Sequence, residues 1–208
     1  MSKNRNMIIG VTGGIACGKS EVCRILREAG YLHIDADDAA HEVLADPEVI
    51  TAIRNEFGED ALAMNEEGNP VINRKALGKI VFNDIRERRK LESITHPKIL
   101  ERIKEKISAA SQPIVIEAVQ LLSSGLGQIC DFVWFIDVNR SAQLQRLVEG
   151  RHLTVEEAEA RLRSQNDNDW NMACMDEVIS SSVPMKIMEE NVLKTAKKCY
   201  NLFNASNE

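Results

Sequence analysis

The stretch from Ile8 to Ser20 constrains this chain more than any other, because it predicts a short apolar strand that runs into a phosphate-binding loop. Gly13 to Ser20 match the pattern G-x-x-x-x-G-K-[ST] at every fixed position, and an apolar helical pattern follows. The glycines let successive backbone N–H groups turn toward phosphate oxygens, and the helix presents its positive end to them. The alternative is a tight turn followed by a solvated lysine. The complete motif favours a nucleoside triphosphate site.

Each residue of this loop has an expected role. In phosphate-binding loops the lysine contacts the β- and γ-phosphates, and the next hydroxyl binds Mg²⁺. We therefore expect Lys19 to act on the phosphates during catalysis and Ser20 to bind Mg²⁺. The expected ATP-binding residues are Gly13, Gly14, Ile15, Ala16, Cys17, Gly18, Lys19, Ser20 and Glu21. The helix N-terminus could lower the pKa of Cys17, although a small residue that fits the loop is the simpler interpretation.

Composition excludes several classes of protein. A chain of 208 residues can bury one sizeable core. Its net charge is -6, and its sequence contains no basic block of the kind typical of nucleic-acid binding. The apolar run after the first residues is too short for a signal peptide or a membrane span, so we expect a cytoplasmic protein without membrane contact. The five cysteines are scattered and show no C-x-x-C pair. We expect reduced thiols, without a structural disulfide or zinc site.

Hydrophobic periodicity predicts alternating strands and helices, and therefore an α/β fold built on a doubly wound parallel sheet. The second strand is expected beside the first. Expected strands after the first lie at 31–34, 113–117, 132–138 and 177–180. Expected helices lie at 22–29, 39–44, 47–57, 141–149, 154–165 and 185–203, with a turn at 65–70. Residues 74–111 are helical in pattern, with interruptions near Asn83-Asp84 and at His96-Pro97.

Three carboxylates follow strands, where open α/β sheets bind ligands. Asp35 and Asp37 come directly after the second strand. We assign Asp35 mainly to capping the next helix and Asp37 to catalysis as a general base. Glu117 ends a buried strand, where it would hold Mg²⁺ or simply mark the exit of the strand into solvent.

Cationic side chains gather around a short loop between two predicted helices, 150–153. Arg146, Arg151, Arg161 and Arg163 border this loop, and a basic hairpin there would close over transferring phosphates. Each arginine alone is more often a solvated helix residue. His96 could meet a ligand or make a helix-terminus hydrogen bond.

These motifs, taken in order, resemble the dephospho-coenzyme A kinase family, whose members phosphorylate the ribose 3′-hydroxyl of dephospho-coenzyme A with ATP. The resemblance extends from about residue 8 to residue 180. It rests on segments 11–20, 34–37, 57–58, 77–82, 91–97, 116–118, 143–147 and 161–165.

The resemblance implies a single kinase domain over residues 1–208. Its core would comprise 1–39, 112–139 and 176–208, with a helical acceptor-binding insertion at 40–111 and a lid at 140–175.

The resemblance also implies that ATP is the co-substrate and that Mg²⁺ takes part. Asp37 would be the base for the 3′-hydroxyl. Lys19 would stabilise the charge of the phosphates during transfer, and Arg151 would be the lid arginine. The implied substrate-binding residues are Thr12, Asp37, His96, Glu117 and Arg163, and the implied Mg²⁺ ligands are Ser20 and Glu117. The partner would be a small molecule, while a monomer and a homo-oligomer both stay open.

The chain departs from the family pattern near the predicted acceptor and lid. The family usually has proline, leucine and then glutamate after the strand of Glu117, where this chain has Val119, Gln120 and Ser123. The usual lid arginine aligns with Gly150, one place before Arg151. The basic cluster after the lid is replaced by residues 171–174, and the asparagine after the last strand by Ser181. These differences keep two alternatives open: a kinase of another small-molecule hydroxyl, and a nucleotide-binding regulatory protein with low turnover.

Overall fold

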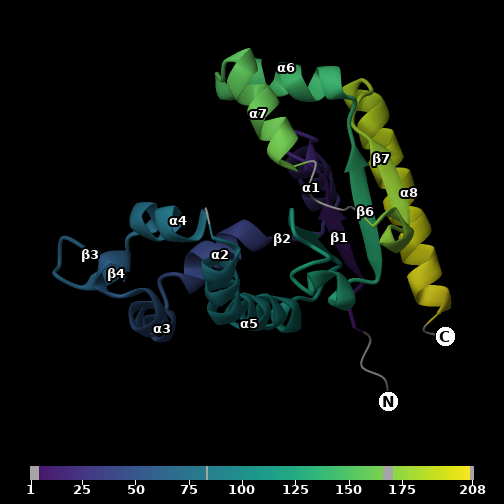
Figure 1. Cartoon of the computed structure of the whole chain (residues 1–208). Helices are drawn as coiled ribbons and strands as arrows, with labels where there is room; N and C mark the ends of the chain where they lie inside the picture. Colours follow the sequence, from purple (N-terminus) through teal and green to yellow (C-terminus); the bar gives the residue numbers. More distant parts are fainter. Residues whose placement is uncertain (1–4, 83, 166–170, 207–208) are drawn as a thin grey trace. The chain divides into compact units, whose positions relative to one another are not determined.

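The computed structural model describes residues 5–82, 84–165 and 171–206. The chain divides into two compact units, Met1–Ile34 with Ala110–Glu208 and Asp35–Ala109 (Figure 1). We call them the sheet unit and the helical unit. The boundaries of the predicted core, insertion and lid remain predictions. Among the helices of the described ranges, none combines the length and the apolar character that crossing a membrane requires.

The sheet unit is built on five strands in the order β2-β5-β1-β6-β7. They are β1 (Ile8–Thr12), β2 (Leu32–Asp35), β5 (Ile114–Glu117), β6 (Phe132–Asp137) and β7 (Glu177–Ser180). β1 pairs in parallel with β5 and β6, and β6 pairs in parallel with β7. The predicted α/β fold with a parallel sheet is therefore confirmed.

The expected place of the second strand was wrong, because β5 lies between β1 and β2. Burial explains this order. All four residues of β5 are buried, whereas only Ile34 of β2 is. A strand buried throughout is stable in the middle of a sheet, and the more exposed strand takes the edge.

The core of the sheet unit lies between one face of the sheet and two helices, α1 (Lys19–Glu28) and α8 (Met185–Ala205). Ile9 and Val11 alternate along β1 and pack with Val22 and Leu26 of α1 and Val192 of α8. The two helices contact each other. Because α1 follows the loop directly, this packing fixes the direction in which the start of the helix points.

Two further helices, α6 (Arg140–Arg151) and α7 (Val155–Gln165), pack together. The predicted capping box is confirmed, since Glu157 N donates to Thr154 Oγ1 and Thr154 N donates to the Glu157 carboxylate. The predicted loop began too early, because Gly150 and Arg151 belong to α6. The helix ends at His152, a left-handed residue with φ 54° whose N–H bonds to Leu147 O. A glycine in an exposed last turn costs too little to end the helix sooner.

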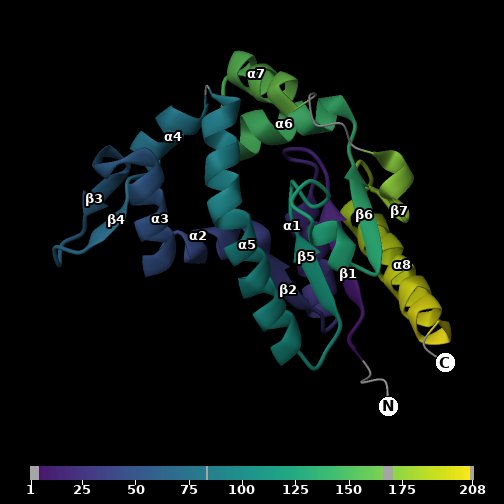
Figure 2. The same cartoon turned by 60° about the horizontal axis from the view of Figure 1, so that its bottom comes forward.

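The helical unit contains α2 (Ala36–Val43), α3 (Pro47–Phe57), α4 (Arg74–Phe82) and α5 (Ile85–Ala109). They share a core that includes Val43, Ile53 and Leu77. The predicted turn at 65–70 joins two short antiparallel strands, β3 (Leu62–Met64) and β4 (Pro70–Ile72), which the sequence pattern did not indicate (Figure 2). Within the described residues, short 3₁₀ segments lie at Glu59–Ala61 in this unit and at Leu126–Ile129 and Met172–Cys174 in the sheet unit.

Two interruptions were predicted in the helical stretch 74–111, and the second of them is wrong. The first falls between α4 and α5, where Asn83 lies outside the described residues. The second does not exist, because Pro97 lies inside α5. A proline in a helix costs about 3 kcal/mol. Packing outweighs this cost: Ile94 and Ile99 contact the core of the helical unit, and Ile103 is fully buried.

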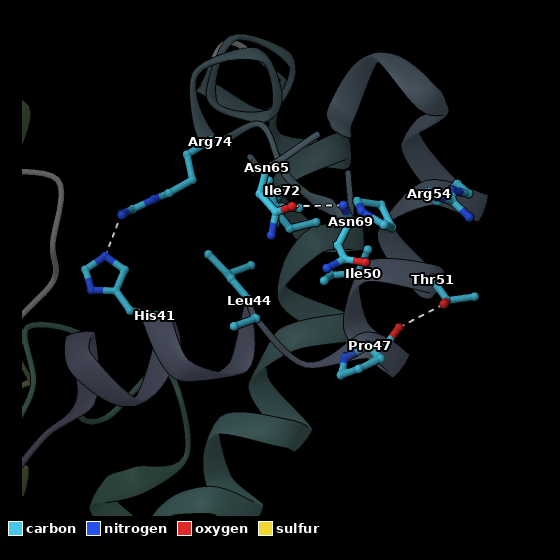
Figure 3. Close-up of a pocket in the computed structure, with 13 residues that line it drawn as sticks. His41, Leu44, Pro47, Ile50, Thr51, Arg54, Asn65, Asn69, Ile72 and Arg74 are labelled. Atoms are coloured by element: carbon cyan, nitrogen blue, oxygen red, sulfur yellow. Dashed lines mark hydrogen bonds between the residues drawn. The ribbon is translucent and has the colours of Figure 1, made fainter. Parts of the chain in front are cut away.

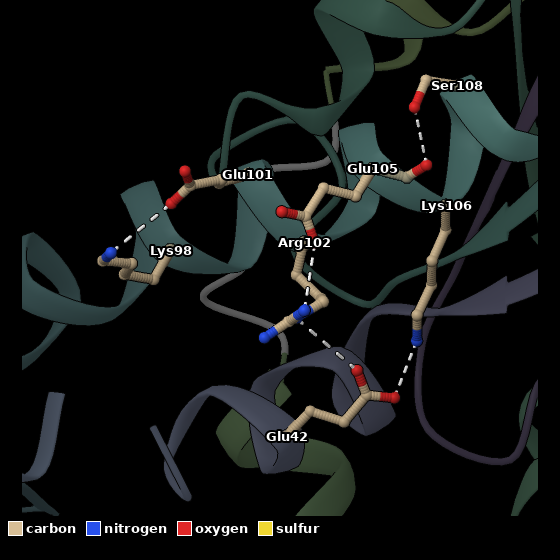
Figure 4. Close-up of polar contacts among 7 residues, drawn as sticks. All are labelled: Glu42, Lys98, Glu101, Arg102, Glu105, Lys106 and Ser108. Atoms are coloured by element: carbon tan, nitrogen blue, oxygen red, sulfur yellow. Dashed lines mark hydrogen bonds and ion pairs between the residues drawn. The ribbon is translucent and has the colours of Figure 1, made fainter. Parts of the chain in front are cut away.

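Ion pairs also join α5 to α2 (Figure 4). Glu42 of α2 lies 2.7 Å from Lys106 Nζ and 4.0 Å from Arg102 Nε. These side chains are largely exposed, so each pair contributes roughly 1 kcal/mol or less. Apolar packing therefore supplies most of the free energy that holds α5 in place.

Candidate active site

The backbone of the loop after β1 is shaped for close contact with an anion. Gly13 has φ 150°, and a Cβ there would lie 2.7 Å from Ile136 O. Gly18 has φ 95° and precedes α1, whose first turn carries no side-chain cap. The N–H groups at the start of α1 therefore remain available to a phosphate, which is the arrangement that phosphate-binding loops use.

Lys19 extends back over this loop. Its Nζ donates to Gly13 O and to Gly14 O, each at 3.0 Å. The ammonium group is thereby held above the loop backbone, where the phosphates of a bound nucleotide would lie. The role of Lys19 in catalysis stays a prediction.

Ser20 and Glu117 come together although 97 residues separate them. Ser20 Oγ donates to Glu117 Oε1 at 2.8 Å, and Glu117 Oε2 lies 3.2 Å from His33 Nε2. The carboxylate is buried rather than at an exit into solvent. Burial alone would raise its pKa, but the hydrogen bonds from His33 and Ser20 and the charge of Lys19 outweigh burial and leave the pKa below its usual value. Glu117 is therefore an anion beside the loop.

The pair offers oxygen ligands of the kind that Mg²⁺ prefers. Thr12, by contrast, is fully buried, and its hydroxyl donates to Val119 O at 3.1 Å. Glu21 lies in the first turn of α1 and pairs with Arg24 at 2.5 Å. The structure therefore brings Ser20 and Glu117 to one point, while Thr12 and Glu21 have other partners.

The loop is supported from outside by residues to which sequence reasoning gave no such role. Ser181 Oγ donates to Cys17 O at 2.6 Å, and Arg146 donates to Ala16 O at 3.2 Å and to Ser181 O at 2.7 Å. Gln143 Nε2 donates to Ile15 O at 2.7 Å. The family resemblance marked Ser181 only as the place of an asparagine. Its contact with the loop follows from the order of the strands, which no local pattern specifies.

A cavity of about 440 Å³ opens beside the loop. Its lining residues include Gly18, Lys19, Ser20, Arg151 and three apolar residues, Val183, Met185 and Met188. An apolar wall next to a phosphate loop suits a nucleobase. Arg151 is exposed and lines the same cavity as the loop, and its role as the lid arginine stays a prediction. Arg163 is not among the residues that line it and lies 3.7 Å from Glu159.

The suggestion that the helix N-terminus lowers the pKa of Cys17 was wrong. Cys17 is buried, and burial raises the pKa of its thiol despite the nearby charge of Lys19. The thiol therefore fills space behind the loop, which agrees with the simpler interpretation.

The other predicted residues lie in the helical unit. Asp35 caps α2, because its Oδ1 accepts from Asp37 N at 2.8 Å. Asp37 lies in the first turn of α2 with an exposed side chain, so its carboxylate is accessible to a ligand. His96 is half-buried well inside α5, so the alternative of a helix-terminus contact is wrong.

The helical unit has a cavity of its own, of about 570 Å³ (Figure 3). At one side Arg74 Nη2 lies 2.5 Å from His41 Nε2, and Leu44 and Ile50 supply apolar surface. Asn65, Asn69 and Thr51 line other parts of it. The combination of a cation, amides and apolar groups suits an elongated ligand with both polar and apolar parts.

Comparison with known proteins identifies the family. The family model CoaE, described as dephospho-CoA kinase, matches residues 7–186. A dephospho-CoA kinase of Streptomyces avermitilis is 38% identical over 187 residues, which cover 88% of this chain and 89% of that relative.

Solved structures agree with this match. A dephospho-CoA kinase from Campylobacter jejuni is 29% identical, with a TM-score of 0.67 over 92% of this chain and 96% of that one. The protein TT1252 from Thermus thermophilus is 25% identical, with a TM-score of 0.78 over 94% of this chain and 98% of that one. This chain belongs to the dephospho-CoA kinase family of α/β kinases.

Proposed function

We propose that this protein transfers the γ-phosphoryl group of ATP to the ribose 3′-hydroxyl of dephospho-CoA and so forms coenzyme A. The observation that supports this most strongly is the pairing of an open phosphate loop with the buried anion Glu117 through Ser20. Family membership supplies the acceptor. In the transfer, the acceptor oxygen bonds to the γ-phosphorus, the bond from that phosphorus to the leaving ADP oxygen breaks, and the hydroxyl proton goes to a base.

Residues 13–21 would hold ATP. The amides at the start of α1 would bind the phosphate oxygens, and Lys19 would exchange its bonds to the Gly13 and Gly14 carbonyls for bonds to phosphate. Ser20 and Glu117 would hold Mg²⁺, which offsets phosphate charge when bound. The cavity lined by Val183, Met185 and Met188 would receive the nucleobase. Arg151 would meet the charge that develops on the transferring group.

Asp37 is the proposed general base. Its exposed carboxylate at the start of α2 can accept the proton of the acceptor hydroxyl. The cavity of the helical unit is the proposed place for part of the acceptor, because it offers the cation Arg74 beside apolar surface.

His96, Thr12 and Arg163 remain predicted substrate contacts. A cytoplasmic location is likewise a prediction of the sequence.

An acceptor screen tests the proposal. Purified protein is given ATP and Mg²⁺, and ADP release is measured with dephospho-CoA and, separately, with nucleosides and other hydroxyl compounds. We expect the highest kcat/KM with dephospho-CoA. Release with another acceptor alone would show that Gln120 and Ser123 mark a changed specificity. ATP binding without acceptor-dependent ADP release would favour a regulatory protein.

A further inference from the structure

Three side chains with metal-binding atoms meet in the sheet unit. The Cys23 sulfur, a His33 ring nitrogen and a Glu117 carboxylate oxygen all lie within 4.8 Å of one another. They come from α1, β2 and β5, which carry them to one point although the residues are far apart in sequence. Within the described ranges this is the one group of three or more such residues. Scattered spacing explains why the cysteine pattern of the sequence gave no sign of it.

The carboxylate of Glu117 has one oxygen for each of two neighbours. Oε1 accepts from Ser20 at 2.8 Å, on the side of the phosphate loop. Oε2 lies 3.2 Å from His33 Nε2. A cation held by His33 can therefore use Oε2 while Oε1 still accepts from Ser20.

The donor set determines which metal would bind. A thiolate, an imidazole and a carboxylate suit Zn²⁺, whereas Mg²⁺ prefers oxygen atoms alone. Tetrahedral Zn²⁺ places such ligand atoms about 3.4 to 3.6 Å apart, from bond lengths of about 2.0 to 2.3 Å. The separation of His33 and Glu117 is already close to this range, at 3.2 Å. A thiolate and a carboxylate together also balance the two charges of the ion.

Burial adds to the argument. Cys23 is fully buried and the Glu117 side chain is 9% exposed, while the His33 side chain, at 21%, leaves a path from solvent. Two buried ligands and one that solvent can reach are compatible with a site that holds a metal with three protein ligands and an open fourth position.

We infer that Cys23, His33 and Glu117 form a binding site for Zn²⁺ or a cation of similar chemistry, with the fourth position open to water. Binding releases the Cys23 thiol proton to solvent. A cation at this site offsets the charge of Glu117, which would otherwise attract Mg²⁺ on the other side of the carboxylate. Zn²⁺ should therefore slow phosphoryl transfer. This consequence rests on the proposed function, but the binding itself does not.

Co²⁺ is the probe for binding, because thiolate ligation gives it a charge-transfer absorption band in the near ultraviolet. The full-length protein is titrated with Co²⁺ and then with Zn²⁺. We expect about one Co²⁺ per chain with the thiolate band, which Zn²⁺ abolishes. Cys23→Ala should lose the band. His33→Gln, which keeps a donor to Glu117, should weaken binding roughly 10- to 100-fold, as loss of a metal-site partner does.

Cys174→Ala is the matched control, because Cys174 is exposed and lies outside the group. It should bind Co²⁺ as the wild type does. The inference is overturned if the wild type shows no thiolate band, or if both Cys23→Ala and His33→Gln bind Co²⁺ as tightly as the wild type. Should Cys23→Ala fail to fold, His33→Gln, at a partly exposed strand position, decides the question.

A kinetic comparison separates binding from its consequence. At fixed ATP and Mg²⁺, the ratio of activity with and without Zn²⁺ is measured for wild type and Cys23→Ala. We expect inhibition of the wild type and a several-fold smaller effect on Cys23→Ala, so that Zn²⁺ bound to ATP itself cancels from the comparison. A Co²⁺ band in the wild type that Cys23→Ala loses, in a protein without acceptor-dependent activity, would support the metal site and contradict the proposed function. Acceptor-dependent activity of a wild-type protein that shows no Co²⁺ band would support the proposed function and contradict the metal site.

Discussion

Ser20 Oγ donates a hydrogen bond of 2.8 Å to Glu117 Oε1 and so joins the end of the phosphate loop to the end of β5. The two residues are brought together because β5 is the neighbour of β1 in the sheet. A hydroxyl at the start of α1 and a buried anion beside it are what a Mg²⁺ site near the phosphates would need.

Replacing Glu117 by glutamine should therefore reduce catalysis more than folding. Glu117→Gln keeps the shape of the side chain and can still accept from Ser20, but it lacks the charge. We expect kcat/KM to fall roughly 100- to 1,000-fold, the usual loss of one electrostatic group, and half-maximal activity to require more Mg²⁺. Steady-state kinetics at several Mg²⁺ concentrations measure this. Glu28→Gln, at the exposed end of α1, is the control and should behave as wild type.

The aspartates of α2 allow a matched comparison of the proposed base. Asp37 and Asp38 are adjacent, exposed and both in the first turn of the helix. Asp37→Asn should lower kcat by roughly 100- to 10,000-fold without weakening ATP binding, because it removes a proton acceptor. Asp38→Asn should change kcat little. Equal rates for the two variants would exclude Asp37 as the base.

Arg146 should contribute to both stability and nucleotide binding, because it donates to Ala16 O, Ser181 Oγ and Ser181 O. Arg146→Met removes these charge-assisted bonds and leaves the carbonyls of Ala16 and Ser181 without this donor. We expect a loss of about 1 to 3 kcal/mol in the free energy of unfolding. The KM for ATP should rise as well. Urea titration and kinetics measure the two effects.

Arg140 on the same helix provides the control for Arg146. Its guanidinium pairs with Glu159 at an exposed site. Arg140→Met should change the free energy of unfolding by no more than about 0.5 kcal/mol. If Arg146→Met and Arg140→Met lower the free energy of unfolding by the same amount, the contacts of Arg146 with the loop do not stabilise the protein.

The protein should lose stability in alkali partly through Cys130. Burial, and to a lesser extent the charge of Asp131, raises the pKa of this thiol from 9.0 to about 12. Between these values the folded protein keeps a proton that the unfolded chain releases. The contribution of Cys130 is therefore complete below about pH 9 and is lost as the pH rises toward about 12, at no more than about 1.4 kcal/mol per pH unit.

Urea midpoints at a series of pH values above about 8 measure this dependence. Cys130→Ala should show a shallower decline in the free energy of unfolding than wild type. Cys174→Ala, which alters an exposed thiol, should follow the wild-type curve. A decline that is the same in all three proteins would mean that Cys130 is not the group responsible.

Local patterns carried most of what the sequence could predict. The phosphate loop, the Thr154–Glu157 capping box and the capping of α2 by Asp35 each depend on residues within a few positions of one another. Their geometry follows from short-range physical rules, so the sequence alone was sufficient.

What the sequence could not predict depends on contacts between distant segments. The position of β5 between β1 and β2, the support of the loop by Ser181 and the meeting of Cys23 with His33 all follow from strand order. Pro97 stays within α5 because of packing against other helices, which no local rule includes. Periodicity indicates that an element exists, but it does not specify its neighbours.

The central claim is that this chain moves the γ-phosphoryl group of ATP to the 3′-hydroxyl of dephospho-CoA. The most direct measurement is to incubate the purified protein with ATP, Mg²⁺ and dephospho-CoA and to identify the product by mass spectrometry and ³¹P NMR. We expect a 3′-phosphorylated product, formed at least about 100-fold more slowly by Lys19→Met. Absence of that product, or equal rates for wild type and Lys19→Met, would contradict the claim.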